Sequence, residues 1–156
     1  MRDPCIHSFI TIIGSVSVTE DGEGNITGVF LPNQNLPPMD ERDSDILVEA
    51  EAQVNEYLSG RRTHFDLPLS IEGTGFRMAV LEAISEIPFG ETRHYSDIAV
   101  SVGSPRAYRA VGTACAENPV PLIIPCHRVV PMTGIGRYAG GVSLKRRLLD
   151  MECERR

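Results

Sequence analysis

The chemistry of this chain is concentrated in one proline-rich stretch, residues 118–130 (NPVPLIIPCHRVV), in which a cysteine is followed directly by a histidine. A thiol near a polarising base loses its proton more readily, and the thiolate is the nucleophile. Three prolines within seven residues exclude a regular helix and predict an extended, rigid path. Because neighbouring side chains of an extended chain point to opposite sides, Cys126 and His127 would cooperate only through a water or another bridging group.

A carboxylate behind the histidine would orient the imidazole ring and favour its protonated form. Glu152, in a helix predicted near the end of the sequence, is one candidate among several. The same spacing is compatible with a structural role, in which Cys126 is a small buried residue and His127 and Arg128 form a solvated pair. The stretch alone leaves both interpretations open.

The cysteines as a set indicate neither disulfides nor a metal cluster. The four of them show no C-x-x-C pair and no metal-finger spacing: Cys5, Cys115, Cys126 and Cys153. We expect Cys115 and Cys153 to be small buried residues. No apolar stretch approaches the roughly 18 residues of a membrane span and no signal peptide is recognisable, so we expect an intracellular protein with reduced thiols and no membrane partner.

The formal net charge of −6 is an average over two unlike halves. Residues 1–72 carry 4 basic and 13 acidic side chains, a net charge of −9, whereas residues 73–156 carry 11 basic and 8 acidic ones, a net charge of +3. Such asymmetry indicates a division of labour, in which the second half would meet a phosphate backbone. An acidic half that only keeps the protein soluble is the other explanation, and the two are compatible.

Residues 1–72 predict a domain with a small antiparallel sheet and one helix. Residues 6–18 are rich in β-branched side chains, and residues 25–31 follow a turn-like cluster of Glu, Asp and Gly, so both are expected in strands. Residues 44–58 have the apolar periodicity of a helix. A short strand is expected at residues 65–69.

Residues 73–156 predict a second, mostly helical domain, which makes the chain an α+β protein. Thr74 is a plausible N-cap for an apolar stripe that stops at Pro88, and residues 142–152 predict a last helix. Residues 96–102 and 104–115 predict two short helices, with serines as their caps. Their outline is that of a helix-turn-helix, which is a weak signal for DNA binding by itself.

Several segments of the second half make the sequence similar to the O6-alkylguanine-DNA alkyltransferase family. The core of the resemblance is residues 124–129 (IPCHRV), and that string is highly specific. Four supporting segments occur in the family's order: 87–92 (IPFGET), 109–112 (RAVG), 118–121 (NPVP) and 138–141 (YAGG). The resemblance covers about residues 75–152. The first 70 residues match only in outline, which implies an RNase H-like supporting domain, and the resemblance carries no function over to it.

The resemblance implies a repair reaction that each molecule performs once. An alkyl group would pass from O6 of a guanine in double-stranded DNA to Cys126, with no cofactor and no metal ion. His127 and Glu152 would form, with a bridging water, the relay that generates the thiolate, and Asn118 would hold the turn that sets Cys126. The thioether is stable and no second group is present to hydrolyse it, so the protein would be consumed.

The resemblance also implies which residues hold the base. Backbone carbonyls of Cys126 and Val129 would accept from the exocyclic amine, and the Ala139 amide would donate toward O6. Tyr138 would wall the pocket. Tyr95 would lie close against the phosphate 3′ to the target nucleotide and promote its rotation, and its hydroxyl would interact with the purine ring. These donors would stabilise the negative charge that develops on the leaving guanine.

A base inside the stack is out of reach, so the target nucleotide would have to be extruded, and Arg109 would fill the space that it leaves. The implied set of DNA-contacting residues is Tyr95, Ser96, Ala107, Arg109 and Gly112. Three positions depart from the family pattern: Tyr108 and Ala139 stand where other residues are frequent, and Glu117 should weaken the local attraction for phosphate. Cys5 and His7 resemble the metal ligands of some members of the family, but the sequence contains no complete set of ligands for a metal ion.

Two other functions are compatible with parts of the sequence. A sensor that binds alkylated bases and recruits other factors is one, although such relatives replace the acceptor cysteine, which is present here as Cys126. An unrelated cysteine hydrolase is the other, although no oxyanion-hole motif is visible. The leading hypothesis is alkyl transfer to Cys126. For a protein with this function we expect a monomer in the cytoplasm, or in the nucleus if the source is a eukaryote.

Overall fold

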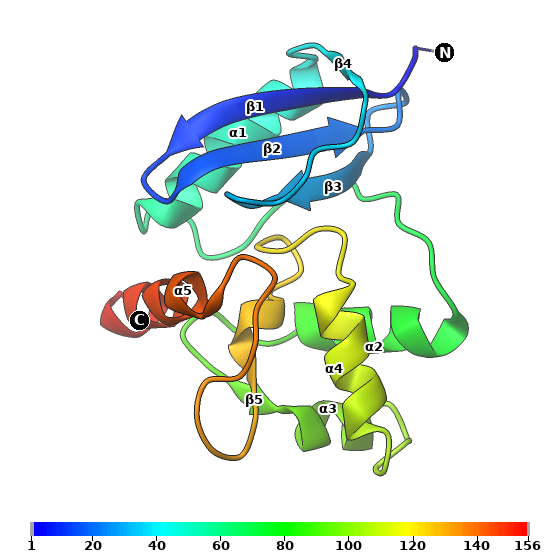
Figure 1. Cartoon of the computed structure of the whole chain (residues 1–156), viewed down its shortest axis with the longest axis vertical. Helices are drawn as coiled ribbons and strands as arrows, with labels where there is room; N and C mark the ends of the chain where they lie inside the picture. Colours follow the sequence, from blue (N-terminus) through cyan, green and yellow to red (C-terminus); the bar gives the residue numbers. More distant parts are fainter. Residues whose placement is uncertain (1, 156) are drawn as a thin grey trace. The chain divides into compact units, whose positions relative to one another are not determined.

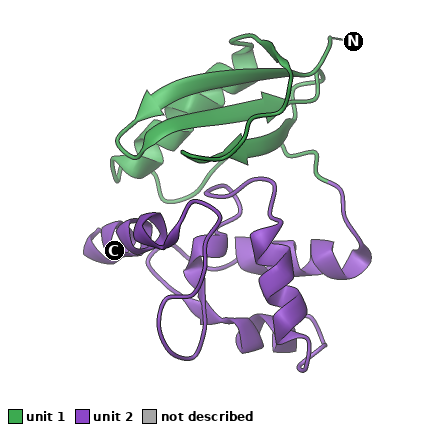
Figure 2. Cartoon of the chain, in the orientation of Figure 1, with its two compact units in different colours: residues 1–71 green, residues 72–156 purple. Residues whose placement is uncertain are grey.

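The computed structural model describes residues 2–155, which form two compact units that divide between Ile71 and Glu72 (Figure 2). This division lies one residue before the boundary expected from the sequence. No helix within residues 2–155 has the length and apolar content that crossing a membrane requires.

The first unit is a four-stranded sheet with one helix (Figure 1). Its strands, in the order β3-β2-β1-β4 across the sheet, are β1 (Cys5–Thr11), β2 (Gly14–Glu20), β3 (Ile26–Phe30) and β4 (Asp40–Glu41). The strands β1, β2 and β3 are antiparallel, which confirms the predicted arrangement. The edge strand β4 pairs in parallel with β1, so the sheet is mixed. Because β4 is two exposed acidic residues, it has no apolar alternation by which to predict it.

Two predicted strand segments differ from the structure. Residues 6–18 are divided into the hairpin β1–β2, because the chain turns before Gly14, whose φ of +111° favours glycine. The segment 65–69 is not a strand. It makes a single bridge from Leu69 to Ile26, where the Pro68 carbonyl accepts from the Ile26 amide at 2.8 Å. Proline cannot donate to a ladder, which limits this segment to a bridge.

The helix α1 (Asp45–Leu58) packs on β1 and β2, and it confirms the helix predicted over residues 44–58. Its apolar face, which includes Leu47, Ala50 and Val54, is fully buried. Burial of each larger side chain of this kind contributes about 1.5–3 kcal/mol relative to leaving it exposed. The sheet and α1 therefore share one core.

The second unit is mostly helical, with a two-residue parallel pairing of β5 and β6 (Figure 1). Its elements are α2 (Gly75–Ser85), β5 (Arg93–His94), α3 (Tyr95–Ser101), α4 (Tyr108–Ala116), the 3₁₀ turn η1 (Cys126–Arg128), β6 (Val129–Val130) and α5 (Val142–Glu154). The predicted cap of α2 is confirmed, since the Thr74 hydroxyl accepts from the Arg77 amide at 3.2 Å. The predicted α+β class is confirmed as well.

The helices α3 and α4 pack against each other, but both begin elsewhere than predicted. His94, not Ser96, caps α3, and the Asp97 carboxylate accepts from the His94 amide at 2.8 Å. Ser104 does not open α4, because the Ala107 amide donates to the Ser104 carbonyl in a separate turn and the helix starts at Tyr108. A serine followed by proline suits such a turn as well as a helix start.

Candidate active site

A clamped turn precedes the cysteine. The Asn118 side-chain amide donates to the Ile124 carbonyl at 2.9 Å, and its oxygen accepts from the Val120 amide at 3.0 Å. Within this turn Leu122 has φ +74°, a conformation that costs a non-glycine residue about 1–3 kcal/mol. Burial of the leucine side chain offsets that cost. The structure thus places Asn118 where it holds the turn that leads to Cys126.

The prediction of an extended path through Cys126 and His127 is wrong. Residues 126–128 form one 3₁₀ turn, in which the Arg128 amide donates to the Pro125 carbonyl at 2.9 Å. Proline at the N-terminal side of a short turn is tolerated because its missing N–H would have no partner there. Side chains of adjacent residues in a 3₁₀ turn project about 120° apart. Cys126 and His127 therefore still point in different directions.

A buried ionic network lies behind the cysteine. The Glu152 carboxylate, on α5, is fully buried and accepts hydrogen bonds from three residues. His127 Nε2 lies 2.7 Å from Oε2, Arg128 donates from Nε at 2.8 Å to Oε1 and from a terminal nitrogen at 3.0 Å to Oε2, and the Gly90 amide donates at 3.1 Å. Arg128 also donates to the Ile87 carbonyl at 2.7 Å. The interpretation of His127 and Arg128 as a solvated pair is wrong, because both are buried.

The His127 ring is a neutral base in this network. Burial lowers its pKa below the usual value for histidine, although the hydrogen bond and charge of Glu152 oppose the shift. Because Glu152 also accepts from the Arg128 guanidinium, its oxygen is the acceptor, and His127 donates from Nε2. The basic nitrogen of the neutral ring is then Nδ1. The water expected between His127 and the thiol stays a prediction.

Cys126 is a buried thiol, and its surroundings stabilise the thiolate form only in part. Burial raises its pKa above the ordinary value, and the largest opposing effects are a hydrogen bond with Asn118 and the positive charge of Lys145. The resting side chain therefore keeps its proton. For this sulfur to act as a nucleophile, a nearby base would have to take that proton.

Sequence reasoning missed Lys145. Its side chain is fully buried on α5, and its ammonium donates to the Val129 carbonyl at 2.8 Å and to the Arg137 carbonyl at 3.2 Å. The same nitrogen lies 6.0 Å from the centre of the Tyr95 ring. A usable signal was present in the sequence, since Lys145, Leu148 and Glu152 are spaced as one inward face of a helix.

Cys126 lies in the wall of a cavity of about 610 Å³, here called the thiol pocket. Six of the predicted site residues line it: Tyr95, Arg109, Gly112, Cys126, Tyr138 and Ala139. Thr113, Cys115, Ala116, Pro131, Gly136 and Arg137 complete the lining. Burial raises the pKa of Tyr95 to about 12, so its hydroxyl is a hydrogen-bond donor at neutral pH.

The other predicted residues lie outside this lining. His127, Glu152 and Asn118 are buried behind Cys126, Ser96 is in the first turn of α3, and Ala107 precedes α4. The two carbonyls expected to bind the exocyclic amine are already engaged. The Cys126 carbonyl accepts from the Val129 amide, and the Val129 carbonyl accepts from Lys145. Each carbonyl oxygen has a second lone pair, which is the one that a base would use.

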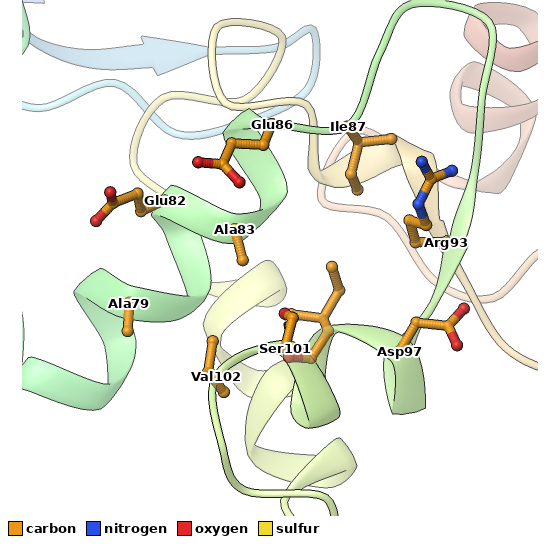
Figure 3. Close-up of a pocket in the computed structure, with 10 residues that line it drawn as sticks. Ala79, Glu82, Ala83, Glu86, Ile87, Arg93, Asp97, Ser101 and Val102 are labelled. Atoms are coloured by element: carbon orange, nitrogen blue, oxygen red, sulfur yellow. Dashed lines mark hydrogen bonds between the residues drawn. The ribbon is translucent and has the colours of Figure 1, made fainter.

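A second cavity, of about 490 Å³, lies between α2 and α3 (Figure 3). The carboxylates of Glu82 and Glu86 from α2 and Asp97 from α3 stand around it, with Arg93 as the basic residue of its lining. Three carboxylates against one guanidinium disfavour phosphate. This cavity contains none of the predicted site residues.

The two remaining cysteines and the possible metal ligands have structural explanations. Cys153 is exposed, contrary to expectation, because it follows the inward-facing Glu152 by one residue on α5. Cys5 is buried in β1, and His7 is bonded to Glu51 at 2.5 Å. Within residues 2–155 no three His, Cys, Asp or Glu side chains are grouped so that they could hold a metal ion.

The site is a buried cysteine in the wall of a pocket that residues of the short helices α3 and α4 also line. A family model for the "6-O-methylguanine DNA methyltransferase, DNA binding domain" matches residues 75–154. A second model, for the "ribonuclease-like domain" of the same methyltransferase, matches residues 7–71. The chain belongs to the 6-O-methylguanine DNA methyltransferase family.

Individual relatives agree with this assignment. The methylated-DNA–protein-cysteine methyltransferase of Methanosarcina barkeri is 52% identical over 105 residues, which span 67% of this chain and 66% of the relative. The constitutive enzyme of that name from Bacillus subtilis is 39% identical over 151 residues, 91% of each chain. The crystal structure of Mycobacterium tuberculosis OGT in complex with DNA has a TM-score of 0.88 at 37% identity, covering 97% of this chain and 94% of that one.

Replacement of Arg128 by methionine should lower the free energy of unfolding by about 3–5 kcal/mol, because it leaves the buried Glu152 carboxylate without its cation. Urea denaturation measures the change. The matched control is Arg93→Met, which removes a half-exposed partner of Glu91 and should cost less than about 1 kcal/mol. Equal, small losses in both variants would show that Glu152 does not depend on Arg128.

Replacement of Lys145 by methionine should move the titration of the Cys126 thiol to higher pH, because the buried cation lowers the pKa of that thiol. The measurement is the rate of iodoacetamide labelling at Cys126 against pH, read by peptide mass spectrometry. Arg137→Met, which removes a different pocket cation, is the control. An unchanged midpoint in the Lys145 variant would contradict the electrostatic role.

Proposed function

We propose that the chain repairs O6-alkylguanine in double-stranded DNA by transferring the alkyl group to Cys126, irreversibly and once per molecule. One observation carries the proposal: the Cys126 thiol lies in the wall of a pocket that Tyr95 and Arg109 also line. The names of the M. barkeri and B. subtilis relatives and the DNA complex of the M. tuberculosis protein support it. We take the acting species to be a monomer in the cytoplasm, or in the nucleus of a eukaryote.

The pocket suits attack on a base that has left the helix. Stacked guanine hides its O6 substituent, so the nucleotide must rotate out of the duplex, at a cost of a few kcal/mol. Arg109 is an exposed residue of α4 that also lines the thiol pocket, so it would occupy the vacated position while the base enters. The positive charge of this half of the chain, a net +3 over residues 73–156, favours the approach of phosphate.

The transfer is a substitution at the alkyl carbon. The sulfur–carbon bond forms as the carbon–O6 bond breaks, and the bonding pair passes to the purine. The thiol proton would pass through a bridging water to Nδ1 of neutral His127, and Glu152 would stabilise the imidazolium that results. The protonated Tyr95 hydroxyl would donate to the leaving purine, whose negative charge needs such donors.

The two alternative functions make different predictions for the same site. A sensor would bind the alkylated base and leave Cys126 unmodified. A hydrolase would release its product and turn over repeatedly. A neutral imidazole that follows the thiol directly in the chain favours alkyl transfer over the sensor function, because a site that only binds the alkylated base has no need of a general base.

Incubation with duplex DNA that contains O6-methylguanine should add one CH2 to the protein, on the peptide that contains Cys126. Mass spectrometry of the intact protein and its peptides measures both mass and position. Cys126→Ala should gain no mass and still bind DNA, whereas Cys153→Ala, which removes an exposed thiol, should react normally. Modification of another residue, or release of product without a protein adduct, would refute the proposal.

Replacement of Arg109 by alanine should slow repair of duplex DNA by roughly tenfold or more, while the reaction with free O6-benzylguanine stays near the wild-type rate, because only the duplex requires extrusion. Single-turnover rates on the two substrates give the comparison. Arg106→Ala removes a neighbouring exposed cation outside the thiol pocket and serves as the control. Equal losses on both substrates would show that Arg109 acts on the pocket itself.

A further inference from the structure

The cavity between α2 and α3 has no part in the transfer described above (Figure 3). Its volume is about 490 Å³, and among residues 2–155 its lining shares no residue with the thiol pocket. Glu82, Glu86 and Asp97 of the lining are exposed. Ile87 and Ile98 are buried, so apolar side chains form the floor of the cavity and carboxylates form its rim. We call this cavity the acidic groove.

Two glutamates of the rim lie at a helix end that disfavours their charge. Glu82 is in the last turn of α2, and Glu86 is the residue that caps its C-terminus. The unpaired carbonyls of a helix C-terminus carry a partial negative charge, and like charges four residues apart on a helix repel each other. Neither glutamate side chain has a hydrogen bond or ion pair within the described part of the chain. A cation supplied from outside would relieve both repulsions.

The basic residue of the lining is engaged elsewhere. Arg93 donates to the Glu91 carboxylate at 3.1 Å and to the Thr92 carbonyl at 2.9 Å, and neither of these acceptors belongs to the groove lining in residues 2–155. The guanidinium is therefore held by its own segment of chain. The rim keeps a negative charge, although residues 73–156 carry a net charge of +3.

An apolar floor with an acidic rim suits a long cationic side chain. Such a side chain can lay its aliphatic stem on the floor while its charged head meets the carboxylates. Arginine fits best, because its planar guanidinium binds a carboxylate through two hydrogen bonds. Glu82 and Glu86 are separated by about 6 Å along the helix axis, so two arginines with the same spacing on a second helix would match them. The rim repels phosphate, which excludes DNA as the occupant.

We propose that the acidic groove docks a basic amphipathic helix of a partner protein. Two arginines one turn apart pair with Glu82 and Glu86, and the apolar side chains beside them cover the floor. The helix does not occupy the thiol pocket, because the two linings are separate. The contact is small, so the binding is of the weak and transient kind.

Fluorescence anisotropy with the full chain tests the proposal. The probe is a labelled, alanine-based helical peptide with arginines at positions i and i+4 and leucines at i+3 and i+7. Two exposed ion pairs together contribute a factor of about 2–30 in affinity, so Glu82→Gln/Glu86→Gln should weaken binding about fivefold. The matched control is Asp150→Asn/Glu154→Gln, which removes an exposed acidic pair of the same spacing from α5 and should change the affinity less than twofold.

A charge exchange gives the sharper comparison. Glu82→Lys/Glu86→Lys should lose the arginine peptide and bind a peptide with glutamates in the two arginine positions, provided that circular dichroism shows an unchanged fold. Equal weakening by the α2 and α5 variants would overturn the proposal, because the peptide would then follow only the acidity of the chain. Failure of the wild-type chain to bind the arginine peptide would overturn it as well.

Self-association is the remaining outcome. Sedimentation that shows a dimer of the wild-type chain, lost in Glu82→Gln/Glu86→Gln, would mean that a second copy fills the groove and would contradict docking of another protein. None of these results depends on whether Cys126 accepts an alkyl group, so the proposed function stands or falls separately.

Discussion

The second unit is organised around a carboxylate that has no access to water. Glu152 is fully buried, so its charge is tolerable only with several strong hydrogen bonds in place at once. These bonds come from His127 and Arg128 in η1 and from the Gly90 amide, which lies in the segment after α2. Two pieces of chain that are distant in sequence, η1 and the segment that contains Gly90, are thus held to one point on α5. The position of Cys126, next to His127, follows from this constraint.

This arrangement also fixes the charge state of the site. Burial keeps the His127 ring neutral and keeps the proton on Cys126, although Lys145 and Asn118 favour the thiolate. A permanent thiolate would react with any electrophile that entered the thiol pocket, and a protein that reacts once cannot recover from a wrong reaction. A buried thiol with a neutral base behind it reserves its reactivity for a ligand that fills the pocket and accepts the bonding pair of the bond that breaks.

The sequence predicted those features that depend on local pattern. The helix of residues 44–58, the Thr74 cap and the α+β class are confirmed, because apolar periodicity and cap chemistry act over a few residues. The IPCHRV string and the four supporting segments indicate Cys126, and the predicted last helix offers Glu152 as a candidate carboxylate. The local sequence pattern did not predict the features that tertiary contacts determine. The 3₁₀ turn at Cys126 exists because His127 and Arg128 must both reach Glu152, and the buried Lys145 looks like any surface lysine until α5 is placed.

The central claim is that the resting site holds a neutral imidazole and a protonated thiol, with the proton transferred only during the reaction. The most direct measurement is the ¹⁵N chemical shifts of the His127 ring nitrogens at neutral pH, in protein with labelled histidine and with a His127→Gln variant for assignment. We predict one protonated nitrogen, Nε2, and one unprotonated nitrogen, Nδ1. Two protonated nitrogens in the free protein would show that His127 is already an imidazolium, with Glu152 as its counter-ion, and would contradict the account.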